Sequence, residues 1–251
     1  MPLLEAEGIT KNFGGLQALC DVDIHISKGE LVSIVGPNGS GKTTLFNIIT
    51  GFYKPTKGSV RFEGNLIGGL SPYRIARAGI GRTFQVTALF DNLRVLDNVV
   101  VGLHRRTTSG IIDALIRDRS YRGEEQNCFE KAKEMLDFVG LGGFDSDYAG
   151  RLPSFSRKRL AIAIALVSDP SLLLLDEPAA GLNVEEVDRL AALLKHIQEC
   201  GVTLCVIEHK MKFVMSLSDR VMVLSEGRKI AEGTPVEVSK DSKVIAAYLG
   251  K

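Results

Sequence analysis

The segment "GPNGSGKTT", residues 36–44, restricts the possible folds of this chain more than any other. It matches the pattern G-x-x-x-x-G-K-[ST], it follows the apolar run "ELVSIV", and a helical pattern begins within it. Glycines at these positions let backbone amides wrap around phosphates, and the new helix adds the positive end of its dipole. Lys42 would reach the β and γ phosphates, and Thr43 would be a ligand of Mg²⁺. The predicted phosphate-binding residues are Gly36, Pro37, Asn38, Gly39, Ser40, Gly41, Lys42, Thr43 and Thr44.

A glycine-rich turn with a stray lysine is the alternative interpretation, and the strand before the loop and the helix after it argue against that alternative. The loop alone leaves kinases, GTPases and many ATPases open. The segment "LLLLDEP", residues 172–178, narrows the choice. Its leucines predict a buried central strand that ends at Asp176, beside the metal. Asp176 would hold Mg²⁺ through water, and Glu177 would orient or deprotonate the attacking water. Two adjacent carboxylates at this place favour ATP hydrolysis over a turn that is merely acidic.

Composition limits the class of protein. The 251 residues, 45% of them hydrophobic, suffice for one large globular domain or two modest ones. Lys and Arg number 31 against 30 Asp and Glu, so the net charge does not favour the binding of nucleic acid. We therefore expect no nucleic-acid partner. The four cysteines form no C-x-x-C pair, which is typical of a reducing compartment. No uncharged run approaches the roughly 18 residues of a membrane span, so we expect a cytoplasmic chain.

The hydrophobic pattern divides the chain into two lobes. The N-terminal third is rich in strand patterns, and from about Leu89 to Leu141 the period becomes helical. After Pro170, strands and helices alternate again, ending in the hairpin-like pair "RVMVLSEGRKIAEG". One lobe is therefore predicted to be α/β and the other helical.

Taken together, these motifs resemble the ATP-binding-cassette (ABC) ATPase family over essentially the full length of the chain. "GRTFQ" places Gln85 at the family's glutamine loop, "VIEH" places His209 at its switch histidine, and "NFGG" places Phe13 at its adenine-stacking position. Each residue alone has an ordinary interpretation, as a surface amide, a strand-end histidine or a core aromatic. Their order and spacing together are specific, and they argue against a kinase or a GTPase.

The resemblance implies an α/β fold: a P-loop ATPase core with an N-terminal antiparallel β subdomain and an inserted α-helical subdomain. The chain 1–251 would be a single ABC ATPase domain, with residues 1–88 and 170–251 as the nucleotide-binding lobe and about 89–169 as the helical and signature region. ATP and Mg²⁺ would be the cofactors. Thr43, Gln85 and Asp176 would be the metal ligands, and Glu177 and His209 the catalytic residues.

Further stretches, among them "GFYKPTKGSV", "LFDNLRVLDNVVVGLH" and the closing "VIAAYLG", resemble the ATPase subunit of branched-chain amino acid importers. This likeness implies a peripheral protein at the cytoplasmic face of the inner membrane, with transmembrane permease subunits, a second ABC ATPase subunit and, indirectly, a solute-binding protein as partners. A related importer of urea or short amides is one alternative. A soluble ABC ATPase not coupled to transport is another, although such proteins carry a long coiled coil or two cassettes, and neither is visible here.

One motif departs from the family. The segment "LPSFSRKRL" aligns with the signature LSGGQ, which in the family faces the ATP held by the opposite subunit of a dimer. Pro153 replaces the serine, Ser154 and Phe155 replace the glycines, and Ser156 replaces the glutamine. We expect Phe155 to bring bulk against the phosphate, and hence a heterodimer with unequal sites.

Simple capping of the helix is the alternative for this segment. Ser154 or Ser156 would cap it, and Arg157, Lys158 and Arg159 would lie on a solvated face. In the unequal-site interpretation, these cations would instead partly compensate by facing an anion. Asn183 and Lys210 also stand where an aspartate is common in the family. The importer branch often has asparagine at the first position, and the sequence offers no interpretation of Lys210.

Overall fold

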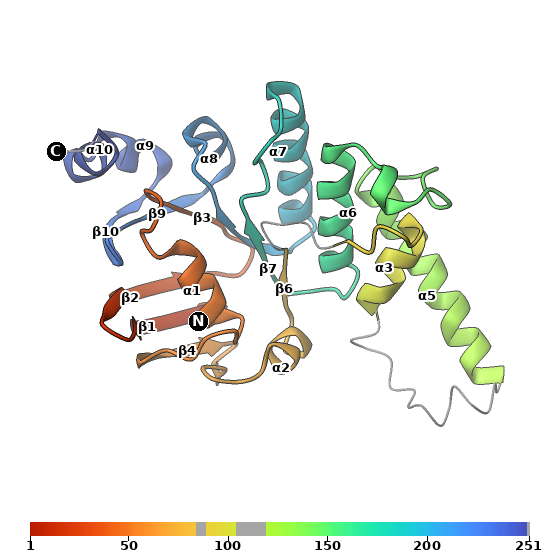
Figure 1. Ribbon diagram of the computed structural model, residues 1–251, viewed down its shortest axis with the longest axis horizontal. Coiled ribbons are helices and arrows are strands. Elements are labelled where there is room, and N and C mark those ends of the chain that lie inside the picture. The colour runs from red at the N-terminus through yellow and green to blue at the C-terminus, as the bar shows by residue number, and fades with distance from the viewer. Residues whose placement is uncertain (84–88, 104–118, 250–251) are drawn as a thin grey trace. The chain divides into compact units, whose positions relative to one another are not determined.

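The chain divides into an α/β unit, residues 1–85 and 171–251, and a helical unit, residues 86–170 (Figure 1). The computed structural model describes residues 1–83, 89–103 and 119–249. Each unit is built around its own apolar core.

The α/β unit contains a six-stranded sheet in the order β10-β9-β3-β8-β7-β6. Adjacent strands are parallel except β10, which pairs antiparallel with β9 as the predicted hairpin. Every residue of β3, β7 and β8 is buried, as is usual for parallel strands covered on both faces. The strands are β3 (Leu31–Val35), β6 (Ile80–Arg82), β7 (Leu172–Asp176), β8 (Thr203–Ile207), β9 (Arg220–Ser225) and β10 (Arg228–Gly233).

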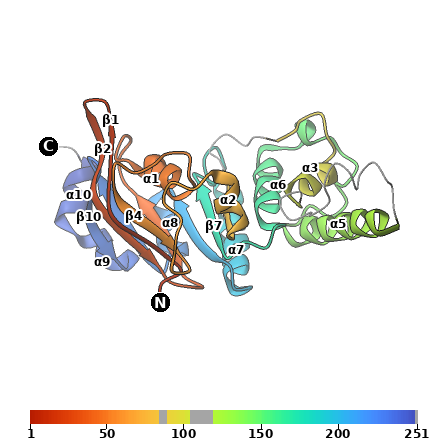
Figure 2. The same ribbon diagram turned by 90° about the horizontal axis from the view of Figure 1, so that it is seen from below.

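A second, antiparallel sheet has the order β2-β1-β4-β5, and Figure 2 shows β1, β2 and β4 side by side. Along the second half of β2, buried and exposed residues alternate, because one face of the sheet packs against the core. This sheet is the predicted N-terminal antiparallel subdomain. Its strands are β1 (Leu4–Phe13), β2 (Leu16–Ile26), β4 (Lys57–Phe62) and β5 (Asn65–Leu66).

Helices and the antiparallel sheet cover the two faces of the six-stranded sheet (Figure 1). On one face, Ile34 and Leu174 pack in a single core with Phe46 of α1 and Ile9 of the antiparallel sheet. On the other face, valines of β3 and β9 pack against valines of α8, α9 and α10. The helices of this unit are α1 (Lys42–Ile49), α2 (Pro72–Arg77), α7 (Val184–Glu199), α8 (Met211–Leu217), α9 (Pro235–Lys240) and α10 (Ser242–Leu249).

The helical unit contains α3 (Val95–Leu103), α5 (Arg119–Phe138), the short 3-10 helix η1 (Ala149–Arg151) and α6 (Ser154–Leu166). Ala132, Leu136 and Val139 are buried, as the helical period predicts. Gly102 permits close packing of α3 on α6, since a Cβ there would lie 2.7 Å from the carbonyl oxygen of Ile164. The inserted helical subdomain is therefore present as expected.

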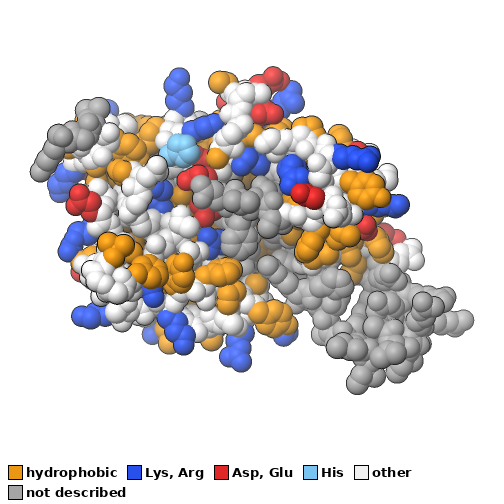
Figure 3. Space-filling model, viewed as in Figure 1, with side chains coloured by type: hydrophobic (Ala, Val, Ile, Leu, Met, Phe, Trp, Pro, Cys, Tyr) orange, Lys and Arg blue, Asp and Glu red, His pale blue; other side chains and the backbone are white. Residues whose placement is uncertain are grey.

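The surface carries both signs of charge. On the face shown in Figure 3, the Lys and Arg side chains of described residues are dispersed among acidic and apolar ones rather than gathered in a patch. None of the helices in the described ranges combines the length and apolar character that a bilayer span requires.

Candidate functional site

Parallel strands of the six-stranded sheet bring most of the predicted site residues to one edge, at the carboxyl ends of the strands. β3, β6, β7 and β8 end at Val35, Arg82, Asp176 and Ile207, and Asp176 pairs with Ile207 in the register of β7 and β8. The phosphate loop follows β3, Glu177 follows β7, and His209 follows β8 by two residues. Ligands of open α/β sheets bind outside the carboxyl ends of the strands. The edge therefore brings together residues far apart in the sequence. Gln85, which follows β6, lies outside the described residues.

The loop of residues 36–41 connects β3 to α1 as predicted. Gly36 has φ +151°, and a Cβ on it would lie 2.0 Å from the carbonyl oxygen of Leu224, so no larger residue fits there. In the described part of the chain, no side chain caps the start of α1 and its first turn contains no acidic residue. The amides at this helix start are suited to an anion.

Lys42 is buried within this loop. Its Nζ donates hydrogen bonds to the carbonyl oxygens of Gly36 at 2.7 Å and Pro37 at 3.0 Å. Burial lowers the pKa of Lys42, and the negative charges of Glu177 and Asp176 oppose that shift. The ammonium group therefore lies within electrostatic reach of both carboxylates. Thr43 is exposed and Thr44 half-exposed beside it.

Among the described residues, only one of the two carboxylate oxygens of Asp176 has a hydrogen-bond partner. Oδ2 accepts a hydrogen bond from Nη2 of Arg82 at 3.1 Å. Burial raises the pKa of Asp176, and the charge and hydrogen bond of Arg82 oppose that rise. Oδ1 is buried and has no hydrogen-bond partner among the residues that the structure describes. A buried carboxylate oxygen of this kind is suited to a cation.

A metal ion at this edge would need ligands beyond the protein's own carboxylates. Across the described ranges, no group of three or more His, Cys, Asp or Glu side chains could hold a metal ion. Mg²⁺ is commonly bound by one or two protein oxygens together with substrate phosphates and water. Asp176 and Thr43 fit that mode of binding.

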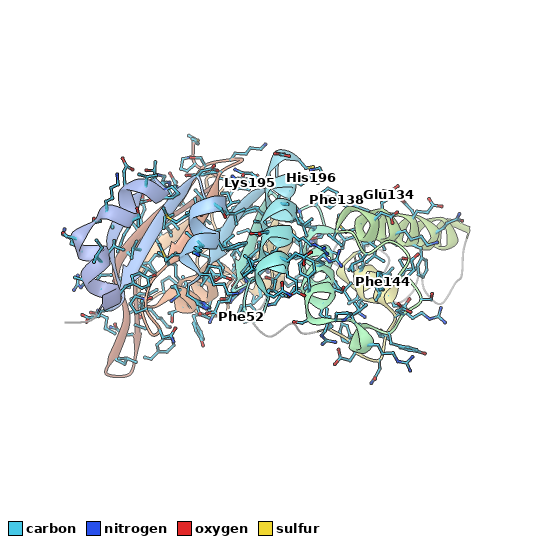
Figure 4. All side chains as sticks on the ribbon, turned by 90° about the horizontal axis from the view of Figure 1, so that it is seen from above. Phe52, Glu134, Phe138, Phe144, Lys195 and His196 are labelled. Atoms are coloured by element: carbon cyan, nitrogen blue, oxygen red, sulfur yellow. The ribbon has the colours of Figure 1, made fainter. Side chains whose placement is uncertain are left out.

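Arg82 is a site residue that sequence reasoning missed. Besides Asp176, its guanidinium donates to Asn47 Oδ1 and Thr50 Oγ1, each at 2.8 Å. The guanidinium carbon lies 5.8 Å from the ring centroid of Phe52, which is labelled in Figure 4. Arg82 therefore connects α1 to Asp176, the carboxylate predicted to bind the metal. Its position in "GRTFQ", just before the predicted glutamine loop, was the available signal.

Glu177 has a strained backbone. Its φ is +49°, in the left-handed region that residues other than glycine rarely adopt, which costs of order 1–3 kcal/mol. The N–H of Glu177 donates to the carbonyl oxygen of Ile207 at 2.9 Å. The sheet edge thus fixes the conformation at the predicted catalytic residue.

His209 has an exposed ring on a well-anchored backbone. Its side chain is 52% exposed, and its N–H donates to Oε2 of the fully buried Glu208 at 2.9 Å. Sequence reasoning also missed Glu208, although a carboxylate that directly follows the apolar run "TLCVI" was a visible signal.

Phe13 lies at the end of β1 in an exposed aromatic pair. Its ring centroid is 5.2 Å from that of Tyr53, with an interplanar angle of 78°. The ammonium group of Lys11 is 4.9 Å from the centroid of Phe13 and 5.7 Å from that of Tyr53. This pair presents the aromatic surface that stacking on a base requires. The adenine-stacking role of Phe13 stays a prediction.

The start of α6 lacks the serine cap expected for the signature segment. Pro153 occupies the N-cap position, and no side chain in the described ranges caps the helix, so the expectation that Ser154 or Ser156 caps it is wrong. The hydroxyl of Ser156 instead accepts a hydrogen bond from Arg159 at 3.2 Å. Arg157 forms an ion pair with Asp91 at 2.8 Å. Arg159 donates to the Gly140 carbonyl at 2.7 Å. Arg157 and Arg159 are half-exposed, so the solvated face expected for them is present in part, although both side chains also bind groups of the helical unit.

The Phe155 side chain is buried. It is 8% exposed, and the guanidinium carbon of Arg159 lies 4.7 Å from its ring centroid. The expectation that Phe155 presses its bulk against a phosphate is wrong, because this ring is part of the core. Pro153 and Ser154 are the exposed residues of the segment.

Comparisons with known proteins cover both units. Residues 19–180 match the family model described as ABC transporter, and residues 228–251 match the model described as branched-chain amino acid ATP-binding cassette transporter. The chain is 42% identical over 251 residues to the high-affinity branched-chain amino acid transport ATP-binding protein BraF of Pseudomonas aeruginosa, and the alignment covers 100% of this chain and 98% of BraF.

Two solved structures extend the comparison. The ADP conformation of MJ1267, an ATP-binding cassette of an ABC transporter, gives a TM-score of 0.87 at 32% identity, with 100% of each chain covered. The dimeric post-hydrolysis state of the ATP-binding cassette MJ0796, bound to ADP and Pi, gives 0.78 at 28% identity, with 92% of this chain and 98% of that chain covered. The predicted fold class is confirmed by these likenesses.

Proposed function

Because the chain belongs to the ABC transporter family, we propose that it is the ATP-binding and ATP-hydrolysing subunit of an importer of branched-chain amino acids. The observation that carries the cargo class is the full-length identity of 42% to a branched-chain amino acid transport protein. The match of residues 228–251 to a model of the same transporter type supports it. In this role the subunit converts ATP hydrolysis into movement of the membrane subunits.

The site at the sheet edge has the parts that ATP hydrolysis needs. The amides of the phosphate loop and Lys42 bind the β and γ phosphates, and Phe13 stacks on adenine. Mg²⁺, when bound, would neutralise developing phosphate charge, and it would be held by Thr43 and, through water, by Oδ1 of Asp176. Glu177 positions the attacking water. The constrained backbone of Glu177 fixes the direction of its side chain. His209, whose ring is exposed, contacts the γ phosphate from the neighbouring strand end.

We place this ATPase in a heterodimer. The altered signature supports this arrangement, since Pro153 has neither a hydroxyl nor an N–H to offer a phosphate. The phosphate loop, Asp176, Glu177 and His209 of this chain form the competent site with the partner's signature. The second site, completed by the exposed part of the Pro153 to Ser156 segment, is slow or structural. The dimeric likeness of MJ0796 supports pairing of cassettes as such.

The remaining partners follow from the proposed transport role. The α/β lobe binds nucleotide, and the helical region, about residues 89–169, contacts transmembrane permease subunits at the cytoplasmic face of the membrane. A solute-binding protein acts through those subunits. Nucleic acid has no part in this function.

Reconstitution tests the proposal. The chain is co-expressed with the permease subunits, the second ATPase and the solute-binding protein of its own organism, and the complex is placed in vesicles containing ATP. Leucine, isoleucine or valine, added outside the vesicles, is expected to stimulate hydrolysis and to accumulate inside them. Urea and acetamide are the matched controls. Stimulation by these and not by the branched-chain amino acids would overturn the cargo class, and an absence of hydrolysis would overturn the ATPase role.

A further inference from the structure

Both neighbours of His209 contact the loop that follows Glu177. We call residues 178–182 the 178–182 loop. Oε1 of Glu208 accepts a hydrogen bond from the N–H of Ala179 at 2.8 Å, and Nζ of Lys210 donates to the carbonyl oxygen of Leu182 at 3.0 Å. The histidine thus lies between two anchors that reach opposite ends of the same loop.

Glu208 is the stronger anchor. Its side chain is 0% exposed, and both carboxylate oxygens are used. Oε1 bonds to Ala179, while Oε2 accepts from the N–H of His209 at 2.9 Å and from the N–H of Lys210 at 3.3 Å. A buried ion is stable only where such donors satisfy it, and hydrogen bonds to charged groups are the strong ones. The carboxylate therefore joins the two loops tightly, since separating them would leave a buried charge without its donors.

Lys210 makes the second connection where the 178–182 loop meets α7. Asn183, the next residue after Leu182, is the N-cap of α7, and its side chain accepts from the N–H of Glu186 in a capping box. The far end of the 178–182 loop is thus fixed to α7 on one side and to Lys210 on the other. Lys210, for which the sequence offers no interpretation, therefore has a defined partner in the 178–182 loop.

A backbone bond completes the arrangement. The N–H of Glu177 donates to the carbonyl oxygen of Ile207. The segment 207–210 therefore contacts Glu177 itself and both ends of the 178–182 loop. We propose that Glu208 and Lys210 are positioning residues that hold His209 in a fixed relation to Glu177, so that the 178–182 loop and the loop of His209 move together. This inference rests on the proposed ATP hydrolysis. A displacement of the 178–182 loop then changes the position of His209, and with it the rate of hydrolysis.

A stabilising role for the α/β unit alone is the competing explanation, and a double-mutant cycle separates the two. Glu208→Gln preserves volume but replaces one acceptor oxygen by a donor, so it cannot serve both loops. In the reconstituted complex we expect the single-turnover rate to fall at least tenfold, with the KM for ATP changed less than twofold. Introduced into His209→Ala, the same change should lower the rate less than twofold further. Equal losses in both backgrounds, or no loss in the wild-type background, would overturn the inference.

Lys210 provides a second test that does not depend on the stability of the Glu208 variant. Lys210→Met should lower the single-turnover rate about three- to tenfold, Lys210→Arg should recover at least half of the loss, and neither should matter in His209→Ala. Lys212→Met, which removes the same charge at an exposed position, is the matched control and should behave as wild type. Full activity of Lys210→Met would overturn the inference. Absence of hydrolysis by the wild-type complex would instead overturn the proposed function, so the two failures are distinguishable.

Discussion

Arg82 and Asp176 form a buried ion pair, with Nη2 and Oδ2 3.1 Å apart and side chains 6% and 2% exposed. The same guanidinium donates to Asn47 and Thr50 of the α1 region. One side chain therefore links β6, β7 and the helix that begins at the phosphate loop. Removing one partner of such a pair leaves the other charge buried and uncompensated.

Arg82→Gln is expected to lower the free energy of unfolding by about 3–5 kcal/mol. Arg82→Lys should lose less, because it keeps the charge but not the planar fork that reaches Asp176 and α1 together. Urea unfolding of the purified chain measures both. Arg74→Gln, at an exposed position on α2, is the matched control and should change the free energy by less than about 0.5 kcal/mol. A similarly small loss for Arg82→Gln would show that the ion pair is not important for stability.

Lys42→Ala is expected to weaken MgATP binding by about 1.5–3 kcal/mol, which is roughly 10- to 150-fold in Kd, because it removes a charge-assisted contact to phosphate. Titration calorimetry with the purified chain measures the affinity. Lys57→Ala removes a lysine from an exposed position on β4 and should leave the Kd unchanged. Equal affinities for Lys42→Ala and wild type would contradict the assignment of Lys42 to the phosphates.

Glu177→Gln is expected to retain ATP binding while lowering turnover at least about a hundredfold, because the group that positions water is lost from a preorganised site. ATP should then trap the cassette dimer, which light scattering detects. Glu185→Gln, an exposed acid in the first turn of α7, serves as control. Turnover near the wild-type rate in the reconstituted complex would remove Glu177 from its catalytic role.

The sequence predicts those parts of the site that are contiguous in the chain. The phosphate loop and Asp176 with Glu177 each occupy a short motif whose local conformation is dictated by glycines or by a buried strand. Arg82 and Glu208 act through residues distant in the sequence, and only the register of parallel strands brings them to their partners. The side-chain direction of Phe155 was unpredictable for another reason. From Leu160 onward α6 is apolar on nearly all sides, so the sequence does not show which face of the helix is buried.

Acid should weaken the fold through Glu30. Burial alone would raise the pKa of this carboxyl, but the hydrogen bonds from Arg220 and Ser27 outweigh it, and the pKa lies below its ordinary value of 4.5. Arg220 donates to its two oxygens at 2.7 and 2.9 Å. A carboxyl whose pKa is lowered by folding contributes stability above its unfolded pKa, and this contribution disappears as pH falls through the folded pKa.

Glu30→Gln is therefore expected to cost about 1–2 kcal/mol at pH 7, and progressively less as pH falls below about 4.5. Urea unfolding at pH 7, 5, 4 and 3 measures the difference between variant and wild type. Glu5→Gln, on β1, is the carboxyl control. A difference that stays constant across the series would contradict the linkage to Glu30.

The altered signature gives the last prediction, and the structure decides how it must be tested. Restoring all four signature residues would include Phe155→Gly, which empties a core position and places glycine in a helix. That change alone should cost about 3–5 kcal/mol for the lost ring and about 1 kcal/mol for the glycine. Phe155→Gly is therefore measured separately by urea unfolding, and the functional test is confined to the exposed positions.

Pro153→Ser with Ser154→Gly restores a hydroxyl, an N–H and close backbone approach at those positions without disturbing the core. If this edge completes a partner's ATP site, the double variant should raise hydrolysis by the isolated chain several-fold, since a homodimer contains two impaired edges. In the reconstituted complex the gain should be smaller, because one site already uses the partner's intact signature. Brisk hydrolysis by the isolated wild-type chain, unchanged by the double variant, would mean that the segment is a tolerated form of the signature and that the two sites are equal.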